Sequence, residues 1–262
     1  MTLRDRSELA EAKRVVVKVG SSSISGENES KIDFLVDALA KSHARGTEVI
    51  LVTSGAIATA LPLFNLDSRP DDLATVQALA SVGQSKLIAR YQESLDKHQI
   101  IAGQVLLTAG DFEDPETRAN AKATLDRLVK LRALPIVNEN DTVATHEIKF
   151  GDNDRLAALV AVLVDADALV LLSDVDALYD MPPTKPGAKR IESVAFGSEL
   201  EDVEIGGSST QVGTGGAVTK VSAAKVATEQ GIAVLLTNTD QVSLALDGAG
   251  VGTWFEAKTK TK

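Results

Sequence analysis

Short runs of Val, Ile and Leu alternate with segments of helical spacing along almost the whole chain. Six apolar runs predict β-strands, at residues 14–19, 48–53, 100–107, 133–137, 168–172 and 232–236. Apolar positions three and four residues apart predict helices at residues 32–39, 71–95, 116–131, 154–164 and 219–230. Strands that are apolar throughout and alternate with helices are typical of an α/β fold, with helices on both faces of a mostly parallel sheet.

The length of the chain, 262 residues, is compatible with one or two domains. No internal repeat divides the chain, and no second hydrophobic core fits after Trp254. We therefore expect one continuous sheet with two lobes. The longest predicted helix, residues 71–95, contains Gly83, where it should be either broken or closely packed against a neighbour.

The composition is acidic, with 27 Lys and Arg against 37 Asp and Glu and a formal net charge of −10. This balance argues against binding to nucleic acid or to an anionic membrane, because both require a basic surface. The longest apolar run, Leu156 to Val164, is too short to span a bilayer, and the N-terminus has no apolar signal segment. The absence of cysteine excludes disulfides and is compatible with the reducing cytoplasm.

Polar, glycine-containing segments follow the predicted strands or begin the predicted helices. They are Lys18-Val-Gly-Ser-Ser-Ser23, Val52-Thr-Ser-Gly-Ala-Ile57, Asn138-Glu-Asn-Asp141, Gly151-Asp-Asn-Asp154, Ser173-Asp174 and Gly213-Thr-Gly-Gly-Ala-Val-Thr-Lys220. Ligands of open α/β sheets bind beyond the carboxyl ends of the strands, where glycine turns expose N–H groups to anions. Each turn alone could be ordinary, but three at one sheet edge favour a polyphosphate site.

Two lysines in these segments have alternative interpretations. Lys18 could extend from the sheet edge into water, and Lys220 could be an exposed helix residue. The short polar residues could cap helices and fill turns, or they could bind an amino group and orient a lysine. This polar cluster contains Asn138, Asn140, Asp141, Asp152, Asn153 and Asp154. His43, His98 and His146 lack metal-ligand spacing, so no metal site is predicted.

Several phosphate-binding scaffolds do not match the sequence. The Walker A loop and the H-R-D and D-F-G motifs of protein kinases are absent. The segment Gly213-Thr-Gly-Gly-Ala-Val218 departs from G-x-G-x-x-G at its last position, which makes a dinucleotide-binding dehydrogenase a weak alternative.

The motifs together resemble the amino-acid kinase superfamily and, within it, the glutamate 5-kinase family. The resemblance extends from about Lys13 to Phe255 and also includes Val82-Gly-Gln84, Gln104-Val-Leu-Leu-Thr108 and Lys149-Phe-Gly-Asp-Asn-Asp154. Its most specific part is the pair N-E-N-D and G-D-N-D. It implies a three-layer α/β/α sandwich on a mainly parallel sheet of about eight strands. Residues 13–165 would form a glutamate-binding lobe and residues 166–256 an ATP-binding lobe of a single kinase domain.

The resemblance implies transfer of the γ-phosphoryl group of ATP, with Mg²⁺, to the side-chain carboxylate of L-glutamate, the first step of proline biosynthesis. Lys18 and Lys220 would stabilise the transferred group, and Asp154 would hold both ammonium groups. Ser54, Asp141 and Asn153 would bind glutamate. Nucleotide-binding positions would be Lys18, Gly20, Gly55, Ser173, Asp174, Thr214, Gly215, Gly216, Ala217, Val218, Thr219 and Lys220. The family also suggests a homo-oligomer inhibited by proline.

Two features depart from the family pattern. Ala177 stands where the family usually has glycine, and the chain stops where many members continue into an RNA-binding-like PUA domain, so the accessory function should be missing. Another acyl-phosphate kinase, acting on N-acetylglutamate or aspartate, is the nearest alternative. A non-catalytic sensor of amino acids or nucleotides is a more distant alternative, because both lysines and Asp154 are present.

Overall fold

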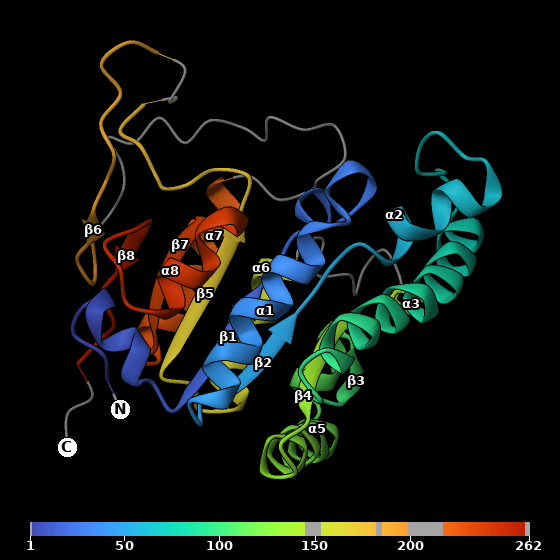
Figure 1. The fold of residues 1–262 in the computed structure, drawn as a ribbon, viewed down its shortest axis with the longest axis horizontal. Coiled ribbons are helices and arrows are strands. Elements are labelled where there is room, and N and C mark those ends of the chain that lie inside the picture. Colours follow the sequence, from blue (N-terminus) through green and yellow to red (C-terminus); the bar gives the residue numbers. More distant parts are fainter. Residues whose placement is uncertain (1, 145–152, 182–184, 199–216, 260–262) are drawn as a thin grey trace.

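A computed structural model describes residues 2–144, 153–181, 185–198 and 217–259. In this part of the chain one eight-stranded sheet has the order β3-β4-β2-β1-β5-β7-β8-β6 (Figure 1). The strands are β1 (Arg14–Lys18), β2 (Glu48–Val52), β3 (Ala102–Leu107), β4 (Leu134–Glu139), β5 (Ala168–Ser173), β6 (Ser193–Val194), β7 (Ala233–Asn238) and β8 (Thr253–Phe255). Only the β7–β8 pair is antiparallel among them, which confirms the prediction of a mainly parallel sheet.

Helices flank this sheet on both sides. The α-helices are α1 (Lys31–Ala44), α2 (Ala56–Ala60), α3 (Leu73–Asp96), α4 (Ala109–Glu113), α5 (Pro115–Lys130), α6 (Asn153–Leu163), α7 (Ala217–Glu229) and α8 (Val242–Leu246). Short 3₁₀ helices are η1 (Arg6–Glu11), η2 (Ser21–Ser23), η3 (Gly26–Asn28), η4 (Leu61–Phe64) and η5 (Thr239–Gln241). All six predicted strands and all five predicted helices are present, with boundaries shifted by a few residues.

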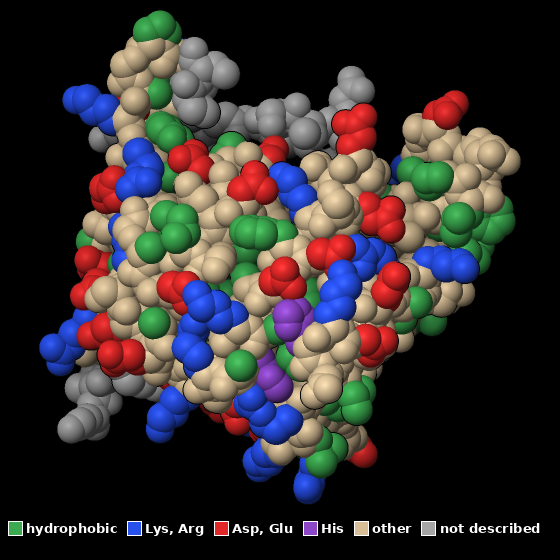
Figure 2. Space-filling view, in the orientation of Figure 1, with side chains coloured by type: hydrophobic (Ala, Val, Ile, Leu, Met, Phe, Trp, Pro, Cys, Tyr) green, Lys and Arg blue, Asp and Glu red, His purple; other side chains and the backbone are tan. Residues whose placement is uncertain are grey.

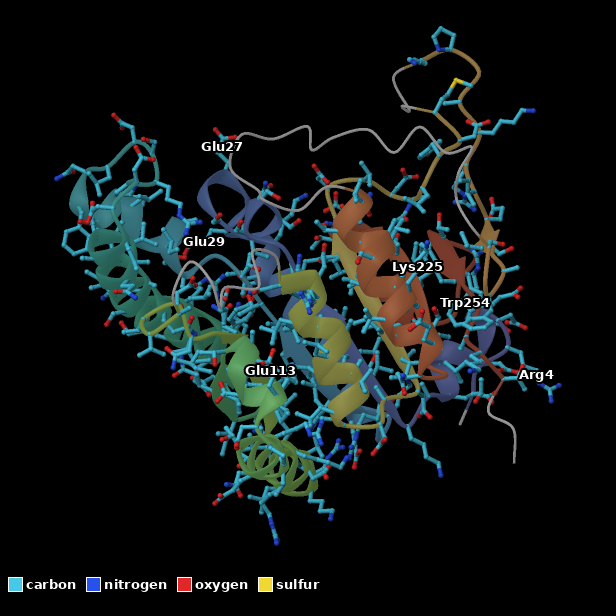
Figure 3. All side chains as sticks on the ribbon, turned by 180° about the vertical axis from the view of Figure 1, so that it is seen from behind. Arg4, Glu27, Glu29, Glu113, Lys225 and Trp254 are labelled. Carbon is cyan, nitrogen blue, oxygen red and sulfur yellow. The ribbon has the colours of Figure 1, made fainter. Side chains whose placement is uncertain are left out.

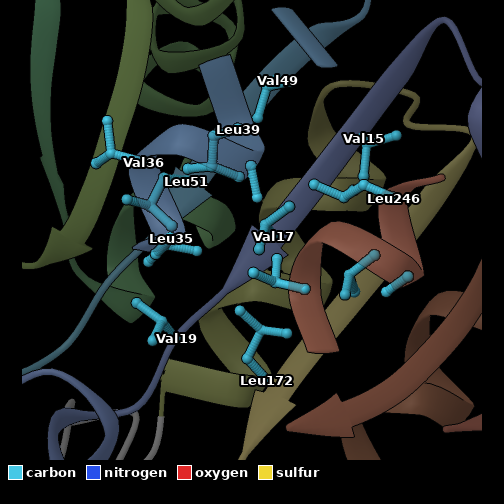
Figure 4. Packing of buried hydrophobic residues seen from close by; sticks show 14 of the residues in the cluster. Val15, Val17, Val19, Leu35, Val36, Leu39, Val49, Leu51, Leu172 and Leu246 are labelled. Carbon is cyan, nitrogen blue, oxygen red and sulfur yellow. The ribbon is translucent and has the colours of Figure 1, made fainter. Parts of the chain in front are cut away.

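Alternation along the central strand separates two hydrophobic cores. Val15 and Val17 of β1 point to the layer that contains α1, α3 and α8, where they pack with Leu35 and Leu39 (Figure 4). Val16 points to the opposite face and packs with α5, α6 and α7, the layer nearest the viewer in Figure 3. Because successive strand residues face opposite sides, a fully apolar strand needs cover on both faces. The three-layer α/β/α fold is thereby confirmed.

The order of the strands locates the ligand crevice. Lys18 at the end of β1 lies in register with Val52 of β2 on one side and Leu171 of β5 on the other. The chain passes from β1 to β2 in one direction, whereas β5 and β7 extend the sheet in the other direction. Crevices beyond the carboxyl ends of parallel strands open at such a reversal of strand order. The carboxyl ends of β1, β2 and β5 are therefore where a ligand is expected.

Helix α3 is continuous, so the helix is not broken at Gly83 but packs closely against a neighbour there. A Cβ atom built on Gly83 would lie 1.7 Å from the carbonyl oxygen of Ala56, in the first turn of α2. No side chain fits at that distance from a backbone atom. Glycine is required here for the contact between α2 and α3, which sets the position of the loop between β2 and α2.

Several short elements were not predicted. Strands β6 and β8 contain two and three residues, and α2, α4 and α8 contain five residues each. Segments of this length carry too few repeats for a period to be recognised, and their stability comes from tertiary packing. Ala177 is buried outside the left-handed region, so its backbone does not require the glycine that is usual in the family.

The surface has no single dominant charge on the face shown in Figure 2, where acidic and basic side chains are interspersed. Two histidines contribute to surface contacts: Nε2 of His43 lies 3.1 Å from the carbonyl oxygen of Arg132, and Nε2 of His98 lies 2.7 Å from Asp37. His146 lies outside the described residues. Across the described part of the chain, no helix has the length and apolar character needed to cross a membrane.

Candidate active site

One carboxylate, Asp154, lies between two lysine ammonium groups at the carboxyl end of the sheet. Oδ1 of Asp154 is 2.5 Å from Nζ of Lys18, and Oδ2 is 2.9 Å from Nζ of Lys220. Lys18 is the last residue of β1, Asp154 lies in the first turn of α6, and Lys220 lies in the first turn of α7. Three elements that are distant in sequence thus meet at one point, and we call these residues the charged triad.

The charged triad is buried. The Asp154 side chain has no exposed surface, and those of Lys18 and Lys220 are 4% and 7% exposed. Two ammonium groups and one carboxylate leave a formal surplus of one positive charge in a site where charge is poorly solvated. An anion bound beside the lysines would compensate this surplus.

Neither lysine is exposed to solvent, as its alternative interpretation would require. Lys18 does not extend past the sheet edge into water, because its ammonium group is paired and almost fully buried. Lys220 is not an exposed helix residue, for the same reason. Asp154 also accepts a hydrogen bond of 3.3 Å from the Thr219 hydroxyl. Asp154 therefore contacts three residues that the resemblance assigned to nucleotide binding.

The loops after β1 and β2 lie next to each other beside the triad. A Cβ atom on Gly20 would be 3.8 Å from Nζ of Lys18, and one on Gly55 would be 3.6 Å from Cα of Ser21. Gly55 has φ of +102°, a left-handed conformation that favours glycine. Within the described residues, the N–H groups of Gly20 and Gly55 donate to no acceptor. These two donors remain available to an anion.

A chain of side-chain amides lies beneath the loop after β2. Nδ2 of Asn153 donates to the carbonyl oxygen of Thr53 (2.6 Å) and to Oδ1 of Asn138 (2.8 Å). Nδ2 of Asn138 in turn donates to Oε1 of Gln84 on α3 (2.7 Å). Asn153, Asn138 and Gln84 are all less than 10% exposed. Asn153 is therefore held by residues at the ends of β2 and β4. Asn138 links it further to α3.

The other two predicted glutamate-binding residues lie at neighbouring strand ends. Ser54 is half-buried and directly follows Thr53 at the end of β2. Asp141 is half-buried in the turn after β4, where the N–H of Val143 donates to the carbonyl oxygen of Asn140. Since β4 pairs with β2, the two loops belong to adjacent strands.

The nucleotide candidates are only partly described. Ser173 is buried at the end of β5, and its hydroxyl donates to Oδ1 of the exposed Asp174 (3.0 Å). Ala217 begins α7, followed by the exposed Val218. Thr214, Gly215 and Gly216 lie outside the described residues, as does Asp152 of the polar cluster.

Two residues of the site region, Gln84 and Tyr91, were not proposed from the sequence. With Gln77, they are spaced seven residues apart on α3. Gln84 contacts Asn138 near the end of β4, and the other two contact loops that follow strands. Gln77 donates to the carbonyl oxygen of Ala144 (3.2 Å), and the Tyr91 hydroxyl lies 2.9 Å from Oγ1 of Thr53. Polar residues at seven-residue spacing occupy one face of a helix. This stripe along an otherwise apolar face is the signal that could have identified them.

The described residues offer no protein-only metal site. None of their His, Asp or Glu side chains form a group of three that could hold a metal ion. A divalent cation at this site would therefore take most of its ligands from phosphate oxygens and water.

Comparison with known proteins gives the family. Residues 13–238 match the amino acid kinase family. The chain is 67% identical to "Glutamate 5-kinase" of Clavibacter sepedonicus, covering 99% of this chain and 100% of that protein. It is 63% identical to that of Leifsonia xyli subsp. xyli over 100% of this chain and 97% of the relative. A longer relative from Salinispora arenicola is 55% identical and is covered over 69% of its length.

A solved structure agrees with this assignment at the level of the fold. Carbamate kinase from Giardia lamblia, bound to AMP-PNP, superimposes with a TM-score of 0.68 at 17% identity, covering 95% of this chain and 100% of that chain. The matched residues 13–238 include the sheet from β1 to β7 and all three members of the charged triad. The chain therefore belongs to the amino acid kinase family.

Proposed function

We propose that the protein transfers the γ-phosphoryl group of ATP to the side-chain carboxylate of L-glutamate, which gives L-glutamyl 5-phosphate and ADP. The observation that carries this proposal is the charged triad, a buried surplus of positive charge beside two backbone N–H donors that have no acceptor among the described residues. The relatives called glutamate 5-kinase, 63–67% identical over nearly their whole lengths, support glutamate as the acceptor. The reaction would be the first step of proline biosynthesis.

The acceptor requires no general base. A glutamate side chain has a pKa near 4.3, so its carboxylate is already ionised at neutral pH. A carboxylate oxygen attacks the γ-phosphorus, and the bond from that phosphorus to the bridging oxygen breaks, leaving its electron pair on ADP. The barrier arises from bringing one anion to another. Lys18 and Lys220 lower it by stabilising negative charge on the transferred phosphoryl oxygens.

The remaining groups orient these charges. Asp154 contacts both ammonium groups and fixes their separation. The N–H groups of Gly20 and Gly55, with that of Gly216, would donate to phosphoryl oxygens. Donors fixed before the reaction need no reorganisation when charge develops, which is the main source of their effect on rate.

Glutamate would bind between the loops after β2 and β4. Asp141 suits the α-ammonium group of the amino acid, because it is acidic and lies in a half-exposed polar turn. Ser54 would donate to its carboxylates. Asn153 already donates both of its amide hydrogens, to Thr53 and Asn138, so its Oδ1 would accept from the ammonium group of the amino acid. The nucleotide would bind beyond β5 and α7, at Ser173, Asp174 and residues 214–220. Residues 13–165 then form the glutamate lobe and residues 166–256 the ATP lobe of one kinase domain.

Mg²⁺ is expected to enter with ATP. When bound, it would neutralise part of the negative charge of the phosphates. The roles given above to the lysines, Asp154 and the glycine amides follow from their own positions and do not depend on metal ligands from the protein.

The test is an ADP-release assay with ATP, Mg²⁺ and each candidate acid, with hydroxylamine added to trap the acyl phosphate as a hydroxamate. ADP and hydroxamate should form with L-glutamate and at most weakly with N-acetylglutamate or aspartate. Turnover of N-acetylglutamate or aspartate in preference to glutamate would overturn the proposed acceptor. Binding of both ligands without ADP formation would indicate a sensor instead.

Regulation and assembly extend this proposal. Proline resembles a smaller glutamate and should compete with it, so glutamate titrations at several proline concentrations test feedback inhibition. Leu63 and Phe64, each 53% exposed on η4, provide apolar surface that a homo-oligomer could cover. Light scattering on the purified protein tests its association. A cytoplasmic location fits the supply of ATP and glutamate.

A further inference from the structure

A buried pair of hydroxyl groups connects α3 to the loop after β2. The Tyr91 hydroxyl lies 2.9 Å from Oγ1 of Thr53, and both residues have 0% exposure. Tyr91 belongs to the core between the sheet and α1, yet its hydroxyl reaches the carboxyl end of β2. Burial raises the pKa of the Tyr91 hydroxyl, so the group keeps its proton at neutral pH.

The second partner of the Thr53 hydroxyl shows which residue donates in this hydrogen bond. Oγ1 of Thr53 also lies 3.1 Å from the carbonyl oxygen of Ser54, which can only accept. A threonine hydroxyl has one hydrogen, and here that hydrogen goes to the Ser54 carbonyl. Tyr91 must therefore donate to Thr53, which gives a directed chain from Tyr91 through Thr53 to the Ser54 carbonyl.

The orientation of the Ser54 carbonyl decides where the next amide points. The Ser54–Gly55 peptide is trans, so the N–H of Gly55 points opposite to the Ser54 carbonyl. The carbonyl is held toward the buried hydroxyl pair, and the N–H is therefore turned away from it. Among described residues this N–H has no acceptor.

Without such a restraint, this peptide would be easy to turn over. Gly55 has φ of +102° and lacks a side chain, so its backbone has few steric limits. A turned peptide would present a carbonyl oxygen where the N–H now lies. An oxygen at that position would repel the anion that the surplus charge of the triad attracts.

We infer that Tyr91 is a positioning residue, which holds the Ser54–Gly55 peptide so that the N–H of Gly55 faces the anion at the charged triad. This inference rests on the proposed phosphoryl transfer for the identity of that anion. Thr53 is also held through its carbonyl oxygen by Asn153. The hydroxyl chain and the amide chain therefore restrain successive peptides of one loop.

The kinetic test uses Tyr91→Phe and the pair Thr53→Val and Thr53→Ser. Tyr91→Phe and Thr53→Val should each lower kcat about tenfold or more, with the KM values for ATP and glutamate changed less than about twofold. Thr53→Ser keeps the hydroxyl and should keep kcat. The double variant Tyr91→Phe/Thr53→Val should lose no more than either single variant, because both act through the same carbonyl.

A matched control separates positioning from stability. Ser94→Ala removes another buried hydroxyl of α3, one that donates to Asp33 of α1 (2.5 Å) and not to the loop after β2. It should lower the melting temperature without changing kcat. A Tyr91→Phe protein with reduced stability and unchanged kcat would overturn the inference. If Tyr91→Phe does not fold, equal kcat values for Thr53→Val and Thr53→Ser would overturn it instead.

A spectroscopic measurement tests the inference even if glutamate is not the acceptor. With ¹³C-carbonyl serine and ¹⁵N glycine, only two peptide units of this sequence give a coupled NMR signal, Ser25–Gly26 and Ser54–Gly55. Tyr91→Phe should move the Ser54–Gly55 signal and leave the Ser25–Gly26 signal in place. An unmoved Ser54–Gly55 signal would refute the role of Tyr91, whereas failure of turnover in the wild-type protein would refute the proposed function.

Discussion

The Nζ atom of Lys18 lies 2.5 Å from Oδ1 of Asp154, and this buried ion pair joins the last residue of β1 to the first turn of α6. Lys220 contacts the other carboxylate oxygen. Burying charge is costly, and a buried ion pair contributes little net stability. The arrangement is better explained by the ability of two fixed ammonium groups to bind and stabilise an anion.

Replacing either lysine should slow the reaction and preserve the fold. Lys18→Ala and Lys220→Ala are each expected to lower kcat by more than about tenfold, since each removes positive charge from the transferred group. The control is Lys225→Ala, which removes an exposed lysine of α7. The fluorescence of Trp254, the only tryptophan and 2% exposed, monitors folding. A folded Lys18→Ala protein with wild-type kcat would contradict the assigned role.

Removing the charge of Asp154 should destabilise the protein. Asp154→Asn keeps the shape of the side chain but removes the carboxylate charge that both buried ammonium groups contact, a loss of about 3–5 kcal/mol. Urea unfolding followed by Trp254 fluorescence measures it. Asp165→Asn, just after α6 with a side chain 78% exposed, is the matched control and should change stability by less than about 0.5 kcal/mol. Equal stabilities of the two variants would contradict this prediction.

Asp141 should affect glutamate binding more than turnover. Asp141→Ala is expected to raise the KM for glutamate about tenfold or more, about 1.4 kcal/mol of binding, with the KM for ATP unchanged. Initial rates at varied glutamate and saturating ATP give this value. Thr142→Ala, at the exposed neighbouring position, provides the control. A glutamate KM unchanged by Asp141→Ala would show that Asp141 only supports the turn.

Gly83 should tolerate no side chain. Gly83→Ala places a Cβ atom 1.7 Å from the Ala56 carbonyl oxygen, so α2 and α3 must separate at a cost of about 3 kcal/mol or more. Gly110→Ala is the control, because its Cβ would have only an ordinary contact of 3.8 Å with Thr108. That variant should be neutral or stabilised by about 0.5–1 kcal/mol. Similar melting temperatures for the two variants would contradict the packing argument.

The contact between α1 and α3 should weaken in acid. Hydrogen bonds from Arg90, Ser94 and Lys97 hold the pKa of Asp33 far below its usual value. A carboxyl group whose pKa is lowered by folding stabilises the fold at pH values above its pKa in the unfolded chain, near 3.9. This stabilisation is lost as the pH falls toward the pKa in the folded protein. Because the Asp33 side chain is 37% exposed, the contribution is about 1 kcal/mol or less.

Melting temperatures of Asp33→Asn and wild type at pH 7, 5 and 3 check this sign. The variant should melt lower than wild type at pH 7, and the difference should shrink toward pH 3. Glu93→Gln removes an exposed carboxylate from α3, the helix that carries Arg90 and Ser94, and controls for net charge. A difference that stays constant with pH would contradict the prediction.

The local pattern of apolar and polar residues was sufficient to predict much of this fold. The apolar runs that became β1, β2, β4, β5 and β7 each occupy a strand covered on both faces, which requires a fully apolar segment. Glycine and short polar residues at the strand ends indicated the edge of the sheet where ligands bind. Strands β6 and β8 escaped prediction because two or three residues carry no readable period.

The sequence by itself determined the α/β class, the strand ends that carry the chemistry and the two lysines as candidates, because each depends on residues within a few positions of one another. Only the tertiary structure decided that Lys18, Asp154 and Lys220 meet in one buried group, and that Tyr91 reaches Thr53. Those contacts depend on sheet register and on how α3, α6 and α7 pack against the sheet. Such geometry arises from interactions between distant segments, which no local period records.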